Sequence, residues 1–184
     1  MRFTFRIGFK KVLILSLFVI SFWAVLFSFI DRNDSEVLHI FIQAEYANED
    51  KIRNDLLQLL KDDGITAIEV TVLSEQNSHF TQTLLTSGLF ESDILILKQS
   101  FVTSFDISTS FKGITVEEIH TIHPSLTVND VFIQDEMMYG VALSDFTMST
   151  YTISSDDTLY AFSSVYTSIH QSILNKVRIY LHKI

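Results

Sequence analysis

The sequence contains no cysteine, and its 184 residues include only one proline. The absence of cysteine excludes a disulfide framework, a thiol nucleophile, a cysteine-ligated zinc site and an iron–sulfur cluster. It also excludes a lipid attached through cysteine. Any attachment to a membrane must therefore come from the polypeptide itself.

Several motifs of catalysis and nucleotide binding are also missing. The sequence has neither of the glycine-rich phosphate-binding patterns, G-x-x-x-x-G-K-[ST] and G-x-G-x-x-G, so it gives no support for a nucleotide site. It also lacks the G-x-S-x-G elbow that would single out a nucleophilic serine. We therefore expect a protein that is not an enzyme and that has no cofactor.

Charge is distributed unevenly along the chain. Residues 1–30 contain four basic and no acidic side chains, whereas residues 31–184 contain all 22 acidic side chains and only nine basic ones, for a formal charge of −13. A body this acidic repels the phosphate backbone of nucleic acids. Nucleic acid is therefore not an expected partner.

An uninterrupted apolar stretch follows the basic N-terminus. Residues 12–30 carry no charge, and serines are their only polar side chains. As a helix that rises about 1.5 Å per residue, this stretch matches the roughly 30 Å hydrocarbon core of a bilayer. The basic residues before it are Arg2, Arg6, Lys10 and Lys11, and they place that side in the cytoplasm by the positive-inside rule.

These features predict a single-pass protein of the cell membrane in three parts. They are a cytoplasmic tail (residues 1–11), a transmembrane helix (residues 12–30) and an extracytoplasmic domain (residues 31–184). The alternative is a cleaved signal peptide, whose apolar region is usually about 7–15 residues long and ends in small residues. Here the apolar run is longer and ends in the bulky Phe29 and Ile30, so we favour an uncleaved anchor.

The first half of the body alternates between strand and helix patterns. Alternating or β-branched apolar residues predict strands, whereas apolar residues at helical spacing predict helices. The expected order is strand 38–42, a helix from the N-cap Asn48 to Gly64, strand 68–73, a helix capped by Asn77 or Ser78 and ending near Gly88, and strand 94–97. Right-handed crossovers would make the three strands parallel and place helices on both faces.

The second half of the body has weaker local signals. Residues 100–130 show little periodicity, and strand patterns follow at 131–134, 138–143 and 158–166. A last helix is expected after Ser168, with apolar residues at helical spacing on one face. Together with the first half, these elements predict one small three-layer α/β domain with a mostly parallel sheet.

Four stretches carry a resemblance to a known family. They are the strand LHIFIQAE with its following helix, the strand DILIL, the strand-turn YGVALSD, and the closing pair TLYAFSSVYTSIHQSILNKV. Their order resembles the first lobe of type 2 periplasmic solute-binding proteins, and the chain is similar to the small, single-helix-anchored forms of low-GC Gram-positive bacteria. In that family the second lobe lies between segments like YGVALSD and TLYAFSS. Here only a short connection separates them, so the resemblance implies one lobe without the second.

Polar residues follow the predicted strands at one edge of the sheet. In an open parallel sheet, ligands and partners contact the carboxyl ends of the strands. The residues expected at this edge are Gln43, Glu45, Ser74, Lys98, Ser100 and Asp145. We therefore predict that these residues form a surface for a ligand or a partner.

Two other sets of polar residues are candidates for metal binding. His120 and His123 are spaced to share one helix face and could hold a metal with Glu117, but they also fit polar loop residues before Pro124. The second set comprises Asp130, Asp135, Glu136, Asp156 and Asp157. It lacks the alternating ligands and the glycine of a calcium loop, so we interpret these carboxylates as solvated turn residues and expect no metal.

Two functions are compatible with these features. The first is a non-enzymatic accessory subunit, in which a solute-binding-like lobe is fixed beside a membrane protein such as a transporter. The second is a reduced receptor that binds a small, cationic solute weakly at the strand ends. One lobe offers only half of a closed ligand site. The missing lobe and the permanent anchor therefore favour the first function.

Overall fold

The computed structural model describes residues 36–104, 107–117, 120, 124 and 126–183. These residues belong to one compact unit, residues 35–184. Within the described ranges, no helix is both long enough and apolar enough to cross a membrane. The predicted tail (residues 1–11) and the predicted transmembrane helix (residues 12–30) lie outside these ranges and stay predictions.

Three parallel strands form one half of the sheet. β1 (Val37–Gln43) lies between β2 (Ala67–Leu73) and β3 (Ile94–Lys98), and both pairings are parallel. All five residues of β3 are buried, as expected of a strand that is covered on both faces. The predicted alternation of strands and helices, with three parallel strands, is confirmed in this half.

Helix α2 (Glu49–Leu60) connects β1 to β2. Its N-cap is Asn48, as predicted, because the Asn48 side chain accepts a hydrogen bond from the backbone N–H of Lys51 at 3.1 Å. Apolar residues recur four apart along its buried face, at Ile52, Leu56 and Leu60. Gly64 follows with φ of 82°, a left-handed conformation that glycine adopts without steric strain.

A second helical segment connects β2 to β3. It consists of α3 (Phe80–Thr83), the π-turn η2 (Leu84–Gly88) and α4 (Leu89–Glu91). The prediction that Asn77 or Ser78 caps this helix is wrong, because the helix begins at Phe80 and the Asn77 side chain instead accepts from the backbone of His79. The polar residues before Phe80 therefore form a turn rather than a cap.

The other half of the sheet is antiparallel. It contains β4 (Ile114–Thr115), β5 (Val131–Gln134), β6 (Met137–Ala142) and β7 (Leu159–Ser163). The seven described strands form one sheet in the order β2-β1-β3-β7-β6-β4, with β5 also pairing with β6. The pairings that involve these four strands are all antiparallel.

The prediction of a mostly parallel sheet is therefore wrong, and the sheet is mixed. A parallel neighbour needs a crossover of a dozen or more residues, usually with a helix, whereas antiparallel neighbours can be joined by short turns. β5 and β6 are joined by a two-residue turn. β7 returns antiparallel to β3 and lies between β3 and β6.

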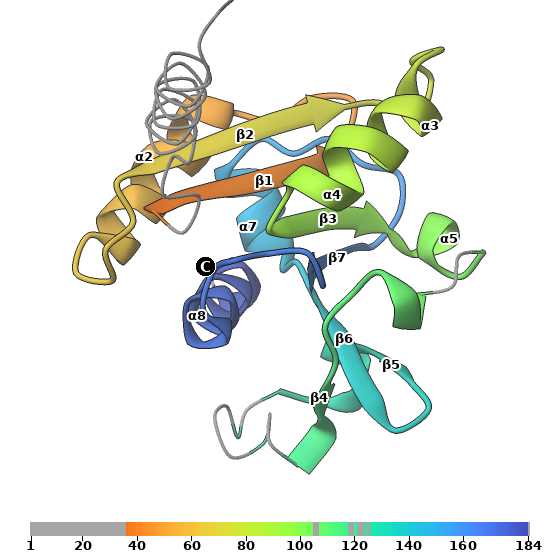
Figure 1. The fold of residues 1–184 in the computed structure, drawn as a ribbon. Coiled ribbons are helices and arrows are strands. Elements are labelled where there is room, and N and C mark those ends of the chain that lie inside the picture. The colour runs from red at the N-terminus through yellow and green to blue at the C-terminus, as the bar shows by residue number, and fades with distance from the viewer. Residues whose placement is uncertain (1–35, 105–106, 118–119, 121–123, 125, 184) are drawn as a thin grey trace, which may run out of the picture. The chain divides into compact units, whose positions relative to one another are not determined.

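Helices cover both faces of the sheet, as predicted (Figure 1). On one face, α2, α7 (Asp145–Thr150) and α8 (Gln171–Lys183) pack over an aliphatic core that includes Leu56 and Leu174. On the other face, the α3–α4 segment and α5 (Gln99–Val102) cover an aromatic core. The last helix begins at Gln171, so the predicted cap at Ser168 is wrong.

The β5–β6 hairpin bends away from the rest of the sheet at a bulge. Phe132 pairs with Gly140 and Ile133 pairs with Met138, so Tyr139 is an extra residue in β6. Such a bulge bends its strand and frees one peptide group from the ladder. The hairpin and the segment before it enclose a small apolar cluster of their own: Leu126, Val131, Met138 and Val141.

The two-residue turn of this hairpin is strained. Asp135 and Glu136 have φ values of 50° and 65°, the pattern of a type I′ turn, which favours Asn-Gly. Replacing Asp135 by Asn and Glu136 by Gly should raise the free energy of unfolding by about 1 kcal/mol, because a left-handed non-glycine residue costs about that much. Urea denaturation in mild detergent measures the change. Glu136→Gln, which removes the charge but not the strain, should not reproduce it.

Candidate functional site at the carboxyl edge of the sheet

Side chains from three neighbouring strand ends meet at one edge of the sheet. Gln43 ends β1, Lys98 ends β3, and Glu75 follows β2. The Gln43 side chain is fully buried; its Nε2 donates to Oε2 of Glu75 at 3.1 Å, and its Oε1 accepts from the backbone N–H of Lys98 at 3.0 Å. One amide therefore links the ends of all three parallel strands.

Lys98 is the cation of this group, and it is 7% exposed. Its Nζ donates to Oδ1 of Asp156 at 2.6 Å and to Oε1 of Glu75 at 3.2 Å. The bond to Asp156, helped by Glu75, raises the pKa of Lys98 even though burial acts in the opposite direction. The same bond lowers the pKa of Asp156. We refer to Gln43, Glu75, Lys98 and Asp156 as the strand-end cluster.

Asp157 makes a second contact at this edge. Its Oδ2 accepts from the backbone N–H of Ser100 at 2.8 Å, and its Oδ1 accepts from the N–H of Thr158 at 2.7 Å. Burial acts to raise the pKa of Asp157, but the bonds from Ser100 and Thr158 and the nearby Lys98 lower it overall. Both neighbouring aspartates therefore bind groups at the end of β3.

The chain that carries these aspartates closes the edge. This closing segment, residues 151–158, follows α7 and precedes β7. It is fixed by backbone bonds from Asn48 N to Tyr151 O (2.8 Å), from Ser154 N to Tyr46 O (3.0 Å) and from Gln99 N to Thr158 O (2.9 Å). Tyr151 and Ile153 are buried in the aliphatic core. The closing segment is thus part of the packed domain.

The remaining predicted edge residues lie nearby, in separate local contacts. Oε1 of Glu45 accepts from Nε2 of Gln76 at 3.3 Å, and Oγ of Ser74 accepts from the backbone of Gln76 at 3.2 Å. Asp145 is exposed in the first turn of α7, where Ser144 is the N-cap. β6 runs parallel in direction to β3 across β7, so α7 begins at the same edge. The role of these residues in binding stays a prediction.

Asp156 and Asp157 are the members of the site that the sequence interpretation missed. Asp156 is solvated, as predicted, but the interpretation missed that Asp156 also binds Lys98 and that Asp157, which is only partly exposed, binds the start of α5. One signal could have found them. Lys98 ends a strand whose residues are all apolar before it, and a buried charge requires a counter-charge.

The other turn carboxylates are of two kinds. Asp135 and Glu136 are exposed in the hairpin turn, as predicted. Asp130 instead completes a capping box with Thr127, whose hydroxyl and backbone N–H both donate to it. Those bonds from Thr127 lower the pKa of Asp130. Within the described ranges, no group of three or more His, Asp or Glu side chains is arranged to hold a metal.

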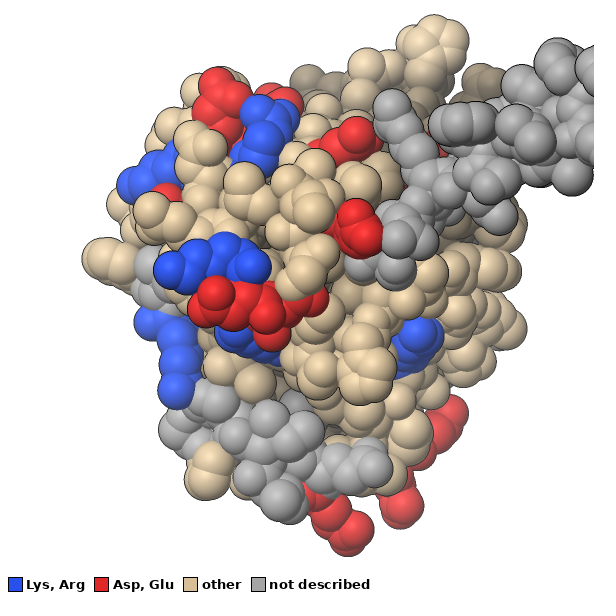
Figure 2. Space-filling view, turned by 60° about the vertical axis from the view of Figure 1, so that its left-hand side comes forward, with Lys and Arg blue, Asp and Glu red and all other residues tan. Residues whose placement is uncertain are grey.

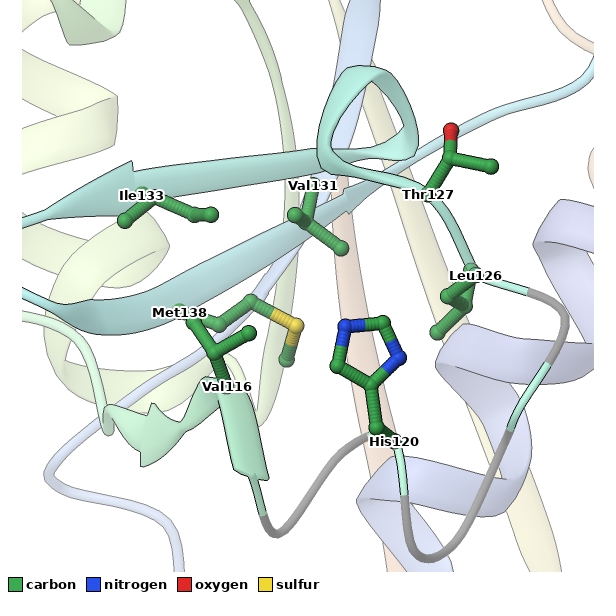
Figure 3. Close-up of a pocket in the computed structure, with 7 residues that line it drawn as sticks. All are labelled: Val116, His120, Leu126, Thr127, Val131, Ile133 and Met138. Atoms are coloured by element: carbon green, nitrogen blue, oxygen red, sulfur yellow. The ribbon is translucent and has the colours of Figure 1, made fainter.

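His120 lines a hollow beside the β5–β6 hairpin, and His123 lies outside the described residues. Figure 3 shows the His120 ring between residues of the hairpin and of the segment before it: Val116, Leu126, Thr127, Val131, Ile133 and Met138. The empty volume is about 220 Å³, including space open to solvent. The part that a water molecule could occupy is only about 10 Å³, roughly room for one water, so this hollow is too small for a ligand site.

A buried arginine occupies the opposite side of the sheet from the aromatic core. Arg178 of α8 is 1% exposed, and its Nη1 donates to the carbonyl oxygen of Tyr139 at 3.1 Å. Tyr139 is the bulge residue, so Arg178 binds the peptide group that the bulge frees. Nη2 donates to Oδ1 of Asn175. Burial lowers the pKa of Arg178 to about 10, which leaves it charged at neutral pH.

Comparisons with known proteins give little further information. No protein-family model matches the sequence, and no curated protein matches it at a significant level. Among solved structures, the chain is similar to the crystal structure of the N-glycan transport solute binding protein (NgtS) from Streptococcus pneumoniae in complex with Man1GlcNAc. The sequence identity is 12% and the TM-score is 0.38; the match covers 65% of this chain and 30% of that one.

Proposed function

We propose that this protein is a membrane-anchored, non-enzymatic accessory subunit whose α/β domain contacts another membrane protein, such as a transporter. The observation that carries the proposal is the closed carboxyl edge of the sheet. A ligand of an open α/β sheet would enter at this edge. The closing segment, residues 151–158, packs there instead and supplies Asp156 and Asp157 to the strand ends.

The polar groups of the edge are already paired within the chain. Lys98 Nζ has two carboxylate partners, and both polar atoms of the Gln43 side chain are hydrogen-bonded. A solute would have to replace these bonds with equal ones before it gained affinity, because a buried polar group that loses its partner costs about 1–3 kcal/mol. Contact with a protein needs no such opening of the cluster, and this favours the accessory role.

The membrane part of the proposal rests on the sequence. The charge-free stretch at residues 12–30 is long enough to span a bilayer, and the basic residues precede it. We propose a cytoplasmic N-terminus and an extracellular domain. The resemblance to single-helix-anchored relatives of solute-binding proteins is consistent with this topology.

Cross-linking and extraction test the accessory role. The full-length protein is cross-linked briefly in cells and purified in mild detergent, and a variant that lacks residues 1–34 serves as the control. We expect a specific polytopic membrane protein to be retained by the full-length chain and lost from the control. A reporter fused after Ile184 should be active outside the cell. The proposal fails if no specific protein is retained, and the topology fails if the reporter is active only in the cytoplasm.

A second candidate function is weak binding of a cationic solute at the same edge. The observation that favours it is the exposure of two carboxylates of the strand-end cluster, since the side chains of Glu75 and Asp156 are 48% and 83% exposed. A polyamine that bound there would raise the melting temperature. At 100 times its Kd, it would add about 2.7 kcal/mol of stability. No shift at millimolar polyamine excludes this function for that class of solute.

A further inference from the structure

Two exposed aromatic rings pair at the edge of the sheet opposite to the strand-end cluster. Phe90 is 57% exposed and Tyr166 is 53% exposed, and their ring centroids are 4.7 Å apart. Phe90 belongs to α4, just before β3 begins, and Tyr166 follows the end of β7. Because β7 is antiparallel to β3, both rings lie at the edge where β1 and β3 begin.

Hydrogen bonds hold the two segments that carry these rings. The hydroxyl of Ser164 donates to the carbonyl of Leu89 at 3.0 Å and accepts from the backbone N–H of Tyr166 at 3.1 Å. The backbone N–H of Asp93 donates to the carbonyl of His39 in β1 at 2.9 Å. The pair is therefore fixed to the beginning of the parallel strands, at the left-hand end of β1 and β3 in Figure 1.

The π-turn adds a third apolar side chain. Leu85 is 47% exposed and lies five residues before Phe90. A π-turn bonds residue i to residue i+5, so this spacing brings Leu85 toward the same side of the helical segment as Phe90. We refer to Leu85, Phe90 and Tyr166 as the aromatic patch.

Charged side chains of both signs lie near this edge. Glu36 and Asp93 directly precede β1 and β3, and Glu91 follows Phe90, whereas Nζ of Lys112 donates to the carbonyl of Thr167, next to Tyr166. Figure 2 brings the left-hand side of Figure 1 forward and shows acidic and basic side chains scattered over it, with uncharged surface between them. Unlike the acidic body as a whole, this side presents no continuous acidic surface that would repel an anionic membrane.

The connection between the predicted membrane anchor and this edge is short. Only six residue steps separate Ile30, the end of the predicted span, from Glu36, which directly precedes β1. At about 3.6 Å per residue, these steps reach no more than about 22 Å. The strand-end cluster lies at the other end of β1, which is about 23 Å long at roughly 3.3 Å per residue.

We propose that the aromatic patch contacts the lipid headgroup region of the bilayer that holds the anchor. Tyrosine favours this region because its ring is apolar and its hydroxyl is polar, and phenylalanine and leucine side chains bury themselves at the boundary between headgroups and acyl chains. The domain then rests on the membrane by the edge where β1 begins, and its carboxyl edge points away from the lipid. This inference rests on the proposed anchor, so its test checks the anchor separately.

Tryptophan fluorescence of the full chain tests the contact. Trp23 is the only tryptophan, and in a Trp23→Phe background either Tyr166→Trp or Tyr46→Trp adds a single reporter. Tyr46 is a matched control, because it is 57% exposed and follows the opposite end of β1. Both variants are reconstituted in phosphatidylcholine vesicles whose acyl chains are brominated near the headgroup. We expect the Tyr166→Trp variant to lose most of its tryptophan emission relative to unbrominated vesicles, and the Tyr46→Trp variant to keep it.

A carbonate wash of the same vesicles reports on the anchor. If the protein stays in the vesicles but the emission of the Tyr166→Trp variant is not quenched, the lipid contact is overturned and the anchor stands. Equal quenching at both positions also overturns it, because the contact is then not specific to this edge. If carbonate extracts the protein, the anchor itself fails and the inference fails with it. If the Tyr166→Trp variant is shielded from iodide quenching in native membranes but not in vesicles, the lipid contact is overturned and the patch is assigned to a protein neighbour instead.

Discussion

Replacing Gln43 by leucine should lower the free energy of unfolding by about 2 kcal/mol, because it leaves a buried backbone N–H without an acceptor. The N–H belongs to Lys98, and Oε1 of Gln43 is its partner at 3.0 Å. Leucine has a similar size, so the packing of the fully buried side chain changes little. The substitution also removes the bond to Glu75, but that carboxylate is half exposed and can be hydrated. Urea denaturation in mild detergent measures the loss.

Gln134→Leu is the matched control for this substitution. Gln134 also ends a strand, β5, but its side chain is exposed, so its replacement should change stability by no more than about 0.5 kcal/mol. Gln43→Glu keeps an acceptor for the backbone N–H of Lys98 but places a buried carboxylate against that of Glu75, so it should not recover the stability that Gln43→Leu loses. Equal losses for Gln43→Leu and Gln134→Leu would show that the buried amide does not hold the strand ends together.

Replacing Gly140 by valine should destabilise the protein by about 3 kcal/mol or more, through overpacking where β6 joins β7. A Cβ atom at Gly140 would lie 2.7 Å from Cε1 of Phe162. The Phe162 ring is fully buried and stacks on Phe111 with centroids 4.7 Å apart, so it has little room to move. The two strands pair over only three residue pairs here, and the substitution is expected to separate them. Thermal unfolding followed by circular dichroism measures the change.

Gly64→Ala separates this steric effect from the general cost of removing a glycine. Nothing lies within 4 Å of a Cβ atom at Gly64, and its φ is 82°, so the alanine is strained by its backbone alone. The expected loss is about 1 kcal/mol. If Gly140→Val unfolded at the same temperature as the unsubstituted protein, the Phe162 ring would have to be free to rotate away from β6.

The first half of the fold could be predicted from sequence because its signals are local. Asn48 as an N-cap, the buried positions of α2 and the apolar residues 94–97 of β3 all follow from residues within one element. The first residues of two helices were predicted incorrectly. The helical segment begins at Phe80 rather than after Asn77 because Asn77 uses its side chain in a turn. α8 begins at Gln171, three residues after Ser168.

The direction of the later strands could not be predicted in the same way. An apolar run such as β7 reads the same in a parallel or an antiparallel pairing, and the choice depends on contacts with β3 that are distant in sequence. The prediction of a mostly parallel sheet extended the pattern of the first three strands to the rest. It failed because a two-residue turn joins β5 to β6, and because β7 returns antiparallel to β3 even though α7 lies between β6 and β7.

The candidate site was predicted in part. The rule that polar residues gather at the carboxyl ends of parallel strands placed Gln43 and Lys98 correctly, and the structure joins them directly. The partners Asp156 and Asp157 depend on the path of the closing segment, which is set by its pairing near Tyr46. Such pairing between loops leaves no periodic pattern, so sequence alone could not show that the edge is closed.

The central position of β7 would make the domain vulnerable during the export that we propose. Among the described strands, β7 comes last in the chain, yet it lies between β3 and β6 and joins the two halves of the sheet. If the chain crosses the membrane from its N-terminus, the facing edges of β3 and β6 stay unpaired until residues 159–163 arrive. The unpaired N–H and C=O groups of a strand edge can pair with other chains. A translocation stall before Leu159 would therefore leave two unjoined half-sheets, open to surface proteases, even though most of the domain had already emerged.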